Sequence, residues 1–306
     1  MTANETSPAG VPAAPFGRML TAMITPMTTG GAVDYDGAER LADYLVTEMR
    51  NDGLVISGTT GESPTTSDAE KERLLRAVIG AVGDRATVVA GVGTNDTAHS
   101  CELARQAQRA GAAALLVVTP YYNKPPQNGL AAHFTAVAEA TGLPVMLYDI
   151  PGRTGTPIAT PTLFRLAEHP RIVAIKDAKG DLGAGCDVIA RTGLAYYCGD
   201  DILNLPWLAV GACGFVSVHG HLVGDRLRDM IDAYLAGDVT AALAIHRDLM
   251  PVYTGMTRTQ NVITTKAALG MLGLPGGPVR PPLADATDAE IQQLAADLEA
   301  GGVKLR

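Results

Sequence analysis

The chain has 306 residues, of which 47% are hydrophobic, 18% are charged and 5% are aromatic, and its formal net charge is −8. This length suits one large α/β domain or two small ones, and the shortage of aromatic residues favours parallel strands covered by helices over a β-sandwich. The negative charge and the lack of a basic cluster argue against nucleic acid as the main partner.

Residues 1–16 are rich in Ala, Pro, Thr and Ser and lack the basic start and apolar core of a signal peptide, so a flexible tail is expected there. No apolar stretch approaches the roughly 20 residues of a membrane-spanning helix, so no membrane partner is expected. The four cysteines are scattered without a C-x-x-C spacing, which is typical of reduced thiols and predicts a cytoplasmic protein. They are Cys101, Cys186, Cys198 and Cys213.

Eight short apolar segments are predicted to be strands, and their starts lie roughly 20 to 35 residues apart. They span residues 20–25, 53–57, 87–92, 114–119, 144–148, 172–176, 195–198 and 214–218. Helix signals lie between them: Ser67 precedes an acidic first turn, and Asp96 or Thr97 opens a helix that ends at Gly111. Eight such repeats predict an α/β fold, a (β/α)8 TIM barrel over residues 17–223.

The segment after the last predicted strand is too long to be one closing helix, since about 85 residues remain there. Helical patterns cover residues 224–236, 239–256, 260–273 and 287–299, and a linker rich in Pro and Gly separates the last two. These patterns predict a C-terminal helical subdomain over residues 224–306, beside the barrel.

Lys176 closes an apolar, β-branched run and lies at the predicted C-terminal end of its strand, where barrel enzymes place their chemistry. Burial disfavours a charged ammonium, and the neutral amine that results is a nucleophile toward carbonyl carbons. The alternative is a lysine that has just left the strand and pairs with Asp177. The run by itself does not decide between these two interpretations.

Further candidates for the same site follow other predicted strands. Tyr148 ends the preceding strand, so its phenol either reaches the same substrate as the lysine or packs at the barrel rim. The segment Gly58–Ser63 places two hydroxyls between glycines, which suits binding of a carboxylate or phosphate oxygen but also an ordinary tight turn. Arg153 is typical of carboxylate binding or of a surface ion pair, and Tyr121 and Tyr122 of an interface or a phenol donor.

Five motifs in order resemble the dihydrodipicolinate synthase / N-acetylneuraminate lyase family of pyruvate-dependent class I aldolases. They are Gly58-Thr-Thr-Gly-Glu62, Thr119-Pro-Tyr-Tyr122, Tyr148-Asp-Ile-Pro-Gly-Arg-Thr154, Ile175-Lys-Asp177 and Gly199-Asp-Asp201. The resemblance runs from about Phe16 to the end of the chain and is closest to the synthases of actinobacteria. It implies condensation of pyruvate with aspartate-4-semialdehyde, which yields the first committed intermediate of diaminopimelate and lysine biosynthesis.

The resemblance implies a catalytic role for four residues. Lys176 forms an imine with pyruvate, and the protonated imine is the electron sink that allows C3 to lose a proton. No metal or organic cofactor is therefore expected. Tyr148 shuttles protons together with Thr59 and Tyr122. In the family, the tyrosine that matches Tyr122 comes from the neighbouring subunit across a tight dimer interface. The usual assembly of the family, a homotetramer built from such dimers, is implied as well.

The resemblance also implies three substrate contacts. Thr60 binds the carboxylate of pyruvate through its hydroxyl and N–H. Val216, on the last strand, makes a backbone contact to pyruvate. Arg153 orients the carboxylate of the semialdehyde.

The chain departs from the family at two places. Asp149 stands beside the catalytic tyrosine where many relatives have Asn, and a small tuning effect is expected. Asp68, Lys71 and His99 occupy positions where feedback-sensitive relatives place His, His and Glu to bind lysine. Because Lys71 repels a lysine ligand and His99 removes a carboxylate partner for its amine, weak or no inhibition by lysine is predicted.

Rival interpretations remain for the chemistry. His219-Gly-His221 can suit a metal, as in a metal-dependent class II aldolase, although rim histidines are the expected reading. Within the family, a sialic-acid lyase or a 2-keto-3-deoxy sugar-acid aldolase or dehydratase shares the lysine and tyrosine but generally lacks an arginine at Arg153. A catalytically silent barrel that binds a keto acid is an alternative of another class.

Overall fold

The computed structural model describes residues 12–305, and its eight strands form a closed barrel in chain order. The strands are β1 (Met19–Ala22), β2 (Gly53–Ile56), β3 (Thr87–Gly91), β4 (Ala114–Val118), β5 (Val145–Asp149), β6 (Ile172–Asp177), β7 (Ala195–Cys198) and β8 (Gly214–Ser217). β1 pairs with β2, and each strand from β3 to β7 pairs with the next, always in parallel. The predicted barrel is confirmed, and each predicted strand overlaps an observed one.

Two compact units make up the described chain. The first contains residues 12–18 and 89–216, and the second contains residues 19–88 and 217–305. The boundaries predicted at residues 16 and 223 stay predictions, and positions 1–11 of the expected tail lie outside the described residues. None of the helices in residues 12–305 combines the length and apolar character needed to cross a bilayer.

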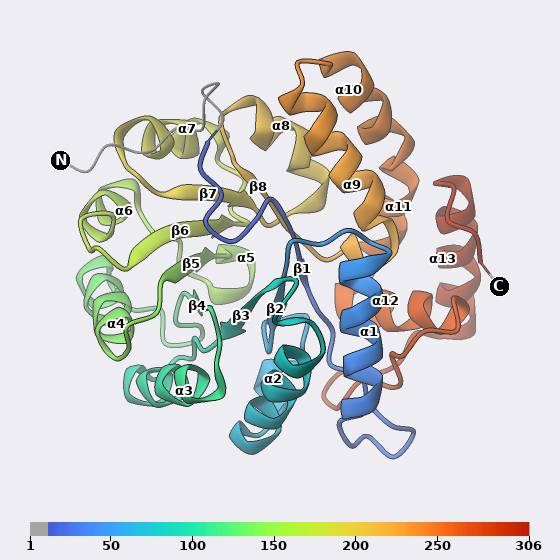
Figure 1. The fold of residues 1–306 in the computed structure, drawn as a ribbon, viewed down its shortest axis with the longest axis horizontal. Coiled ribbons are helices and arrows are strands. Elements are labelled where there is room, and N and C mark those ends of the chain that lie inside the picture. The colour runs from blue at the N-terminus through green and yellow to red at the C-terminus, as the bar shows by residue number, and fades with distance from the viewer. Residues whose placement is uncertain (1–11, 306) are drawn as a thin grey trace. The chain divides into compact units, whose positions relative to one another are not determined.

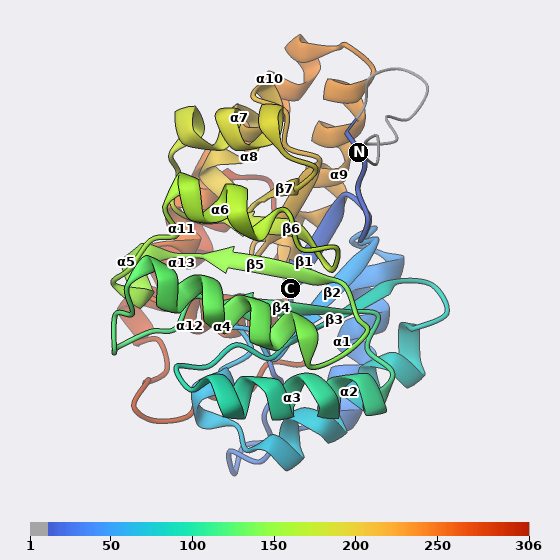
Figure 2. The same ribbon diagram turned by 90° about the vertical axis from the view of Figure 1, so that its left-hand side faces the viewer.

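In the first unit, helices lie along the outer side of strands β4 to β7, as Figures 1 and 2 show for α3, α4, α6 and α7. The helices of this unit are α3 (Thr97–Ala110), α4 (Gln127–Glu139), α5 (Pro151–Thr154), α6 (Thr160–Leu166), α7 (Leu182–Arg191) and α8 (Asn204–Ala209). Asp96 caps α3 through the N–H of Ala98, and Gly111 ends it in the left-handed conformation, as predicted.

The segment before β1 is held against the first unit from residue 12 onward. Phe16 is buried and stacks on Tyr197, whose hydroxyl accepts the Phe16 N–H at 3.2 Å. Arg18 donates to the carbonyls of Pro12 and Cys213 at 2.9 Å each. These contacts tie residues 12–18 to β7 and to the residue that precedes β8.

The second unit contains the remaining helices, of which α9 to α13 run from orange to red in Figure 1. They are α1 (Tyr35–Thr47), α2 (Asp68–Val82), α9 (Gly220–Leu235), α10 (Val239–Asp248), α11 (Met250–Met256), α12 (Asn261–Met271) and α13 (Asp288–Ala300). Ser67 and Glu70 form a capping box at the start of α2, which confirms the predicted start. The C-terminal helices are present as predicted, except that the pattern over residues 239–256 forms two helices.

Candidate active site

Lys176 and Tyr148 lie side by side at the C-terminal ends of β6 and β5. They are register partners, and the next pair along the two strands is Asp149 with Asp177. The ammonium nitrogen of Lys176 lies 4.4 Å from the centroid of the Tyr148 ring, and both side chains are buried. The apolar strand Ile172–Asp177 therefore delivers one amine against one phenol ring, within reach of a single small substrate.

Burial changes the acid–base chemistry of this amine. Lys176 is 3% exposed, and loss of solvation lowers its pKa from 10.5 to about 8. The carboxylates of Asp201 and Asp200 raise its pKa, whereas the charge of Arg153 lowers it. About a tenth of the amine is consequently neutral at pH 7, and the neutral amine is the state that attacks a carbonyl carbon.

Gly199 makes room for the lysine side chain. A Cβ at this position would lie 2.8 Å from both Cγ and Cε of Lys176 and 3.0 Å from the carbonyl oxygen of Asp177. The Gly199 N–H donates to that same carbonyl at 2.7 Å, so a shift of this backbone would disturb that hydrogen bond. The glycine of the Gly199-Asp-Asp201 motif is thus required sterically, a role that the motif alone did not reveal.

The other predicted residues of the first unit differ in their surroundings. Arg153 is exposed on the short helix α5, whose last turn ends at Gly155 in the left-handed conformation. Val216 is buried in β8. Tyr122 is 89% exposed and has a φ of +73°, which is unusual for a residue with a bulky side chain. Neighbouring Tyr121 is half-buried, and burial raises its pKa.

Thr59 and Thr60 belong to the second unit, in the turn that follows β2. The Thr59 carbonyl accepts the Glu62 N–H at 3.1 Å, and the Gly61 carbonyl accepts the hydroxyl of Thr25 at 2.7 Å. Thr60 is buried, whereas Thr59 is half-buried. The turn is compact and internally bonded, and its relation to Lys176 stays a prediction from the sequence.

A buried charge network fixes this threonine turn, and sequence reasoning missed it. Lys266 of α12 donates to the Glu62 carboxylate at 2.5 Å and to the Pro278 carbonyl at 2.7 Å. The second carboxylate oxygen of Glu62 accepts the Arg280 N–H at 2.8 Å. The side chains of Lys266 and Glu62 are only 3% and 1% exposed. The one available signal was a single charge within the apolar pattern of α12.

The three positions compared with lysine-sensitive relatives have distinct surroundings. The ammonium of Lys71 donates to the Thr66 carbonyl and lies 4.0 Å from a carboxylate oxygen of Asp68. Burial lowers the pKa of Lys71. Asp68 and His99 are both exposed. The position of Lys71 is therefore taken by a cation that its own neighbours, Thr66 and Asp68, hold in place.

The two histidines after β8 serve packing and backbone contacts. Nδ1 of His221 lies 2.7 Å from the Val218 carbonyl, and its Nε2 accepts the Ile24 N–H at 3.1 Å. The ring of His219 stacks on Tyr253 with centroids 5.5 Å apart. Across the described part of the chain, no three His, Cys, Asp or Glu side chains gather as metal ligands would. Because both ring nitrogens of His221 are engaged, this pair does not suit the metal interpretation.

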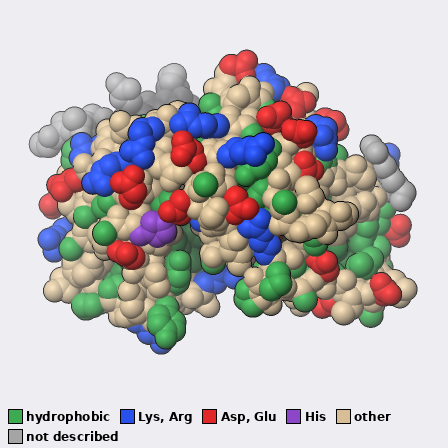
Figure 3. Space-filling model, turned by 90° about the horizontal axis from the view of Figure 1, so that it is seen from below, with side chains coloured by type: hydrophobic (Ala, Val, Ile, Leu, Met, Phe, Trp, Pro, Cys, Tyr) green, Lys and Arg blue, Asp and Glu red, His purple; other side chains and the backbone are tan. Residues whose placement is uncertain are grey.

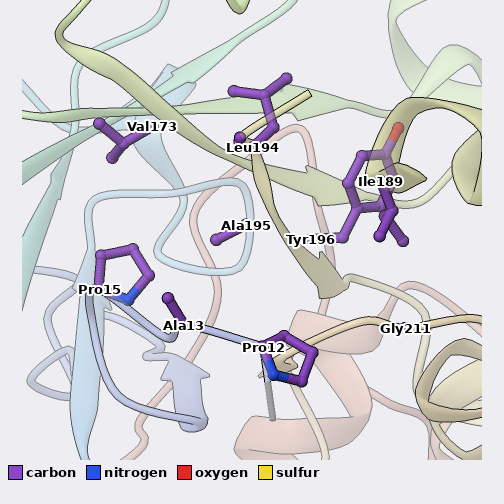
Figure 4. A pocket seen from close by; sticks show the side chains of 10 residues that line it. Pro12, Ala13, Pro15, Val173, Ile189, Leu194, Ala195, Tyr196 and Gly211 are labelled. Atoms are coloured by element: carbon purple, nitrogen blue, oxygen red, sulfur yellow. The ribbon is translucent and has the colours of Figure 1, made fainter. Parts of the chain in front are cut away.

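A pocket of about 190 Å³ lies at the opposite end of the strands from Lys176. Its lining includes Val173 and Ala195 near the starts of β6 and β7, together with Pro12 and Pro15 (Figure 4). Barrel enzymes hold their chemistry at the other strand ends, so this pocket lies away from the candidate active site. On the face in Figure 3, basic and acidic side chains are mixed and form no basic patch for a polyanion.

Comparisons with known proteins agree over nearly the whole chain. The model of the dihydrodipicolinate synthetase family matches residues 15–301. A 4-hydroxy-tetrahydrodipicolinate synthase 2 from Streptomyces coelicolor is 67% identical over 299 residues, covering 98% of this chain and 100% of that protein. A 4-hydroxy-tetrahydrodipicolinate synthase from Acidothermus cellulolyticus is 68% identical over 289 residues, covering 94% of each. The crystal structure of the Cyanidioschyzon merolae enzyme with lysine bound superimposes with a TM-score of 0.92 at 42% identity, covering 94% of this chain and 99% of that chain.

Proposed function

The chain belongs to the dihydrodipicolinate synthetase family, and we propose that it condenses pyruvate with aspartate-4-semialdehyde through an imine on Lys176. The observation that carries this proposal is the buried amine, with its pKa lowered to about 8, against the ring of Tyr148. The product then feeds diaminopimelate and lysine biosynthesis.

The proposed reaction begins when the neutral Lys176 amine attacks the keto carbon of pyruvate and water is lost. The resulting protonated imine withdraws electrons from C3, which loses a proton and becomes an enamine carbon. That carbon forms a bond to the aldehyde carbon of the semialdehyde. The amino group of the acceptor then attacks the imine carbon, closes the ring and displaces the lysine amine. Lys176 supplies the electron sink, so the proposal includes no metal or organic cofactor.

The proposal gives the remaining predicted residues distinct roles. Tyr148, with Thr59 and Tyr122, moves protons while the imine forms and the ring closes. Thr60 binds the pyruvate carboxylate through its hydroxyl and N–H, and the backbone at Val216 contacts pyruvate. Support for the first of these roles comes from the position of the Tyr148 ring against the amine.

Arg153 binds the carboxylate of the semialdehyde in this proposal. Support comes from its charge, which acts on the pKa of Lys176 and thus lies near the reacting amine. A guanidinium also matches a carboxylate with two parallel hydrogen bonds. The charge of the acceptor therefore suits the site.

We propose that the protein is a homotetramer built from tight dimers and that Tyr122 completes the site of the neighbouring subunit. The 89% exposure of Tyr122 and its φ of +73° support this, because a strained, uncovered aromatic residue is typical of a contact completed elsewhere. Residues 17–223 then form the catalytic barrel and residues 224–306 its helical subdomain. Four free cysteines suit the reducing cytoplasm, which is the proposed location.

Reduction with borohydride tests the proposed intermediate directly. The protein is incubated with pyruvate and borohydride and digested, and the modified peptide is located by mass spectrometry, with the Lys176→Met variant as the control. A pyruvate adduct on Lys176, together with turnover when aspartate-4-semialdehyde is added, is the expected result. Pyruvate binding without an adduct favours a silent barrel, and an adduct on Lys124 or Lys179 means that the site is misplaced.

We further propose that lysine inhibits this enzyme weakly or not at all. The Lys71 ammonium, hydrogen-bonded to the Thr66 carbonyl, would repel the side-chain amine of a lysine ligand. A titration of the purified enzyme with lysine measures this. Strong inhibition at submillimolar lysine would contradict the proposal.

A further inference from the structure

The loop that carries Arg153 is closed at its base by one carboxylate. This loop leaves β5 after Asp149, forms α5 and returns to the buried backbone of Ile158. The N–H of Ile158 lies 3.2 Å from each carboxylate oxygen of Asp149. Asp149, the last residue of β5, thus joins the start of the Arg153 loop to its end at Ile158.

Lys179 binds the other backbone polar group of Ile158, its carbonyl. Its ammonium lies 3.4 Å from the Ile158 carbonyl and 3.5 Å from the Asp149 carboxylate. Lys179 is itself positioned by Asp177, whose carboxylate accepts the N–H groups of Lys179 and Gly180 at 2.9 Å each. Ile158 is therefore bound on its N–H side by a carboxylate and on its carbonyl side by an ammonium.

Asp149 and Lys179 form a clamp on the backbone of Ile158. This clamp lies at the same two strand ends as the pair of Tyr148 and Lys176. Tyr148 pairs with Lys176, and one residue further on Asp149 pairs with Asp177. Because successive side chains of a strand point to opposite faces, the phenol and amine lie on one face and the two carboxylates on the other. A shift of the clamp would consequently be transmitted to the loop without displacing the lysine.

Stability does not account for the buried Asp149 carboxylate. It is fully buried, and burial raises its pKa from 3.8 to about 6, against the opposing effects of Lys179 and the Ile158 N–H. The other titratable groups that interact with it are Asp177 on β6 and Tyr196 on β7, and Asp181 before α7 acts on both of these neighbours. Since the folded state binds the proton more tightly than the unfolded state, stability falls as the pH rises from about 4 to about 6.

We propose that Asp149 and Lys179 are positioning residues that hold the Arg153 loop in the geometry that binds the acceptor's carboxylate. The inference rests on the proposed function, because it assigns the acceptor to Arg153. A guanidinium makes two parallel hydrogen bonds only when its backbone is fixed, since a small misplacement of a positioning group already costs much of its effect. The ionised clamp provides that fixed backbone, and it loosens when Asp149 takes up a proton.

The test compares Asp149→Asn, Lys179→Met and the double variant with the wild type, by steady-state kinetics in both substrates between pH 5 and pH 8. Each single variant is expected to raise the KM for aspartate-4-semialdehyde roughly three- to tenfold at pH 7.5, with the KM for pyruvate unchanged. The double variant should resemble the single variants, because all three remove the same clamp. Asp187→Asn, which removes an exposed pair with Arg191 on α7, is the matched control.

The pH profile and the melting temperature separate positioning from a purely structural role. In the wild type, kcat/KM for the acceptor should fall below about pH 6, and this limb should be absent in Asp149→Asn and shifted upward in Lys179→Met. Asp149→Asn should not lower the melting temperature at pH 7.5. An unchanged acceptor KM, equal changes for both substrates, or a pH limb that persists in Asp149→Asn would each overturn the inference. Absence of wild-type turnover with the semialdehyde would instead overturn the proposed function, and the inference with it.

Discussion

The surroundings of Lys176 argue against one of the two roles that its sequence left open. The alternative to a nucleophile was an ion pair with Asp177. In the structure the Asp177 carboxylate accepts the backbone N–H groups of Lys179 and Gly180, and strand alternation turns it to the face opposite Lys176. Sequence alone could place the lysine at the end of a strand, but the direction of its neighbour's bonds depends on the loop that follows.

The lowered pKa of Lys176 predicts that both the reactivity of the amine and the stability of the fold increase as the pH rises. Formation of the borohydride-trapped adduct should accelerate as the pH rises from 6 to 9, with a midpoint near the pKa of about 8. The pKa is 10.5 in the unfolded chain, so the buried ammonium destabilises the fold below pH 8, and this loss is recovered between pH 8 and 10.5.

Replacement of Lys176 by methionine tests both effects in one protein. Lys176→Met should lower kcat by about a thousandfold or more, as loss of a covalent nucleophile does in other enzymes. It should also raise the melting temperature at pH 7, because an apolar chain of similar length replaces a buried charge. Calorimetry and steady-state kinetics measure the two. A variant that melts earlier than the wild type at pH 7 would mean that the ammonium is stabilised by its neighbours.

Gly199→Ala is predicted to disable the site although it replaces no reacting residue. The new methyl group would lie 2.8 Å from Cγ and Cε of Lys176, so the lysine must leave its position or the backbone must shift. A loss of kcat of about a hundredfold is expected, the size that a 1 Å misplacement can produce. Gly193→Ala is the control, because a Cβ there meets nothing within 4 Å. Equal kinetics for the two variants would contradict the steric role of Gly199.

The threonine turn depends on a helix that lies far from it in sequence. Glu62 of the turn and Lys266 of α12 are separated by 204 positions, and their buried ion pair is completed by the Arg280 N–H. Helical periodicity predicts which face of α12 is buried, but it does not predict the partner of the charge on that face. Helix α12 thus helps to fix the turn that carries Thr59 and Thr60, a contact that no motif indicated.

Breaking this ion pair should weaken both the fold and pyruvate binding. Lys266→Met leaves a buried carboxylate short of its main partner and should lower the free energy of unfolding by about 3 to 5 kcal/mol. The double variant Lys266→Met/Glu62→Gln should lose less, because no unpaired charge remains. Removal of the exposed Arg76–Glu72 pair by Arg76→Met should cost less than about 1 kcal/mol.

Chemical denaturation measures these losses, and kinetics of the variants that remain folded report on the turn. Because Glu62 closes the turn that carries Thr60, the KM for pyruvate should rise in the double variant while the KM for the semialdehyde changes less. Equal stability losses for Lys266→Met and for the double variant would contradict the explanation that an unpaired Glu62 carboxylate causes the loss.

Strands and helices themselves were largely predictable, and the exceptions have local causes. The eight strands follow from short β-branched runs between helical patterns, which tertiary packing did not override. The prediction of a single helix over residues 239–256 was wrong. α10 ends at Asp248 and α11 begins at Met250, with Pro251 in its first turn. Proline has no N–H to donate to the preceding turn and favours a new helix start, whereas periodicity continues across the break.

For the whole molecule, the open question is how many chains make one site. Tyr122 follows β4 on a loop in which Lys124 also has a positive φ, and its side chain is 89% exposed. Strain of this kind persists when another contact compensates for it. A phenol that acts on Lys176 chemistry in the neighbouring subunit would account for both observations, and it predicts that each dimer contains two shared sites.

Subunit mixing tests this sharing with two inactive variants. Lys176→Met lacks the nucleophile, and Tyr122→Phe should lose about a hundredfold in kcat as a relay donor. In a mixed dimer, the site with the intact lysine receives the intact tyrosine from the Lys176→Met subunit. Random mixing in equal amounts makes half of the dimers mixed, each with one whole site, so about a quarter of wild-type activity should return. If Tyr122 acts within its own chain, every site in the mixture has a defect and activity stays at the level of the separate variants.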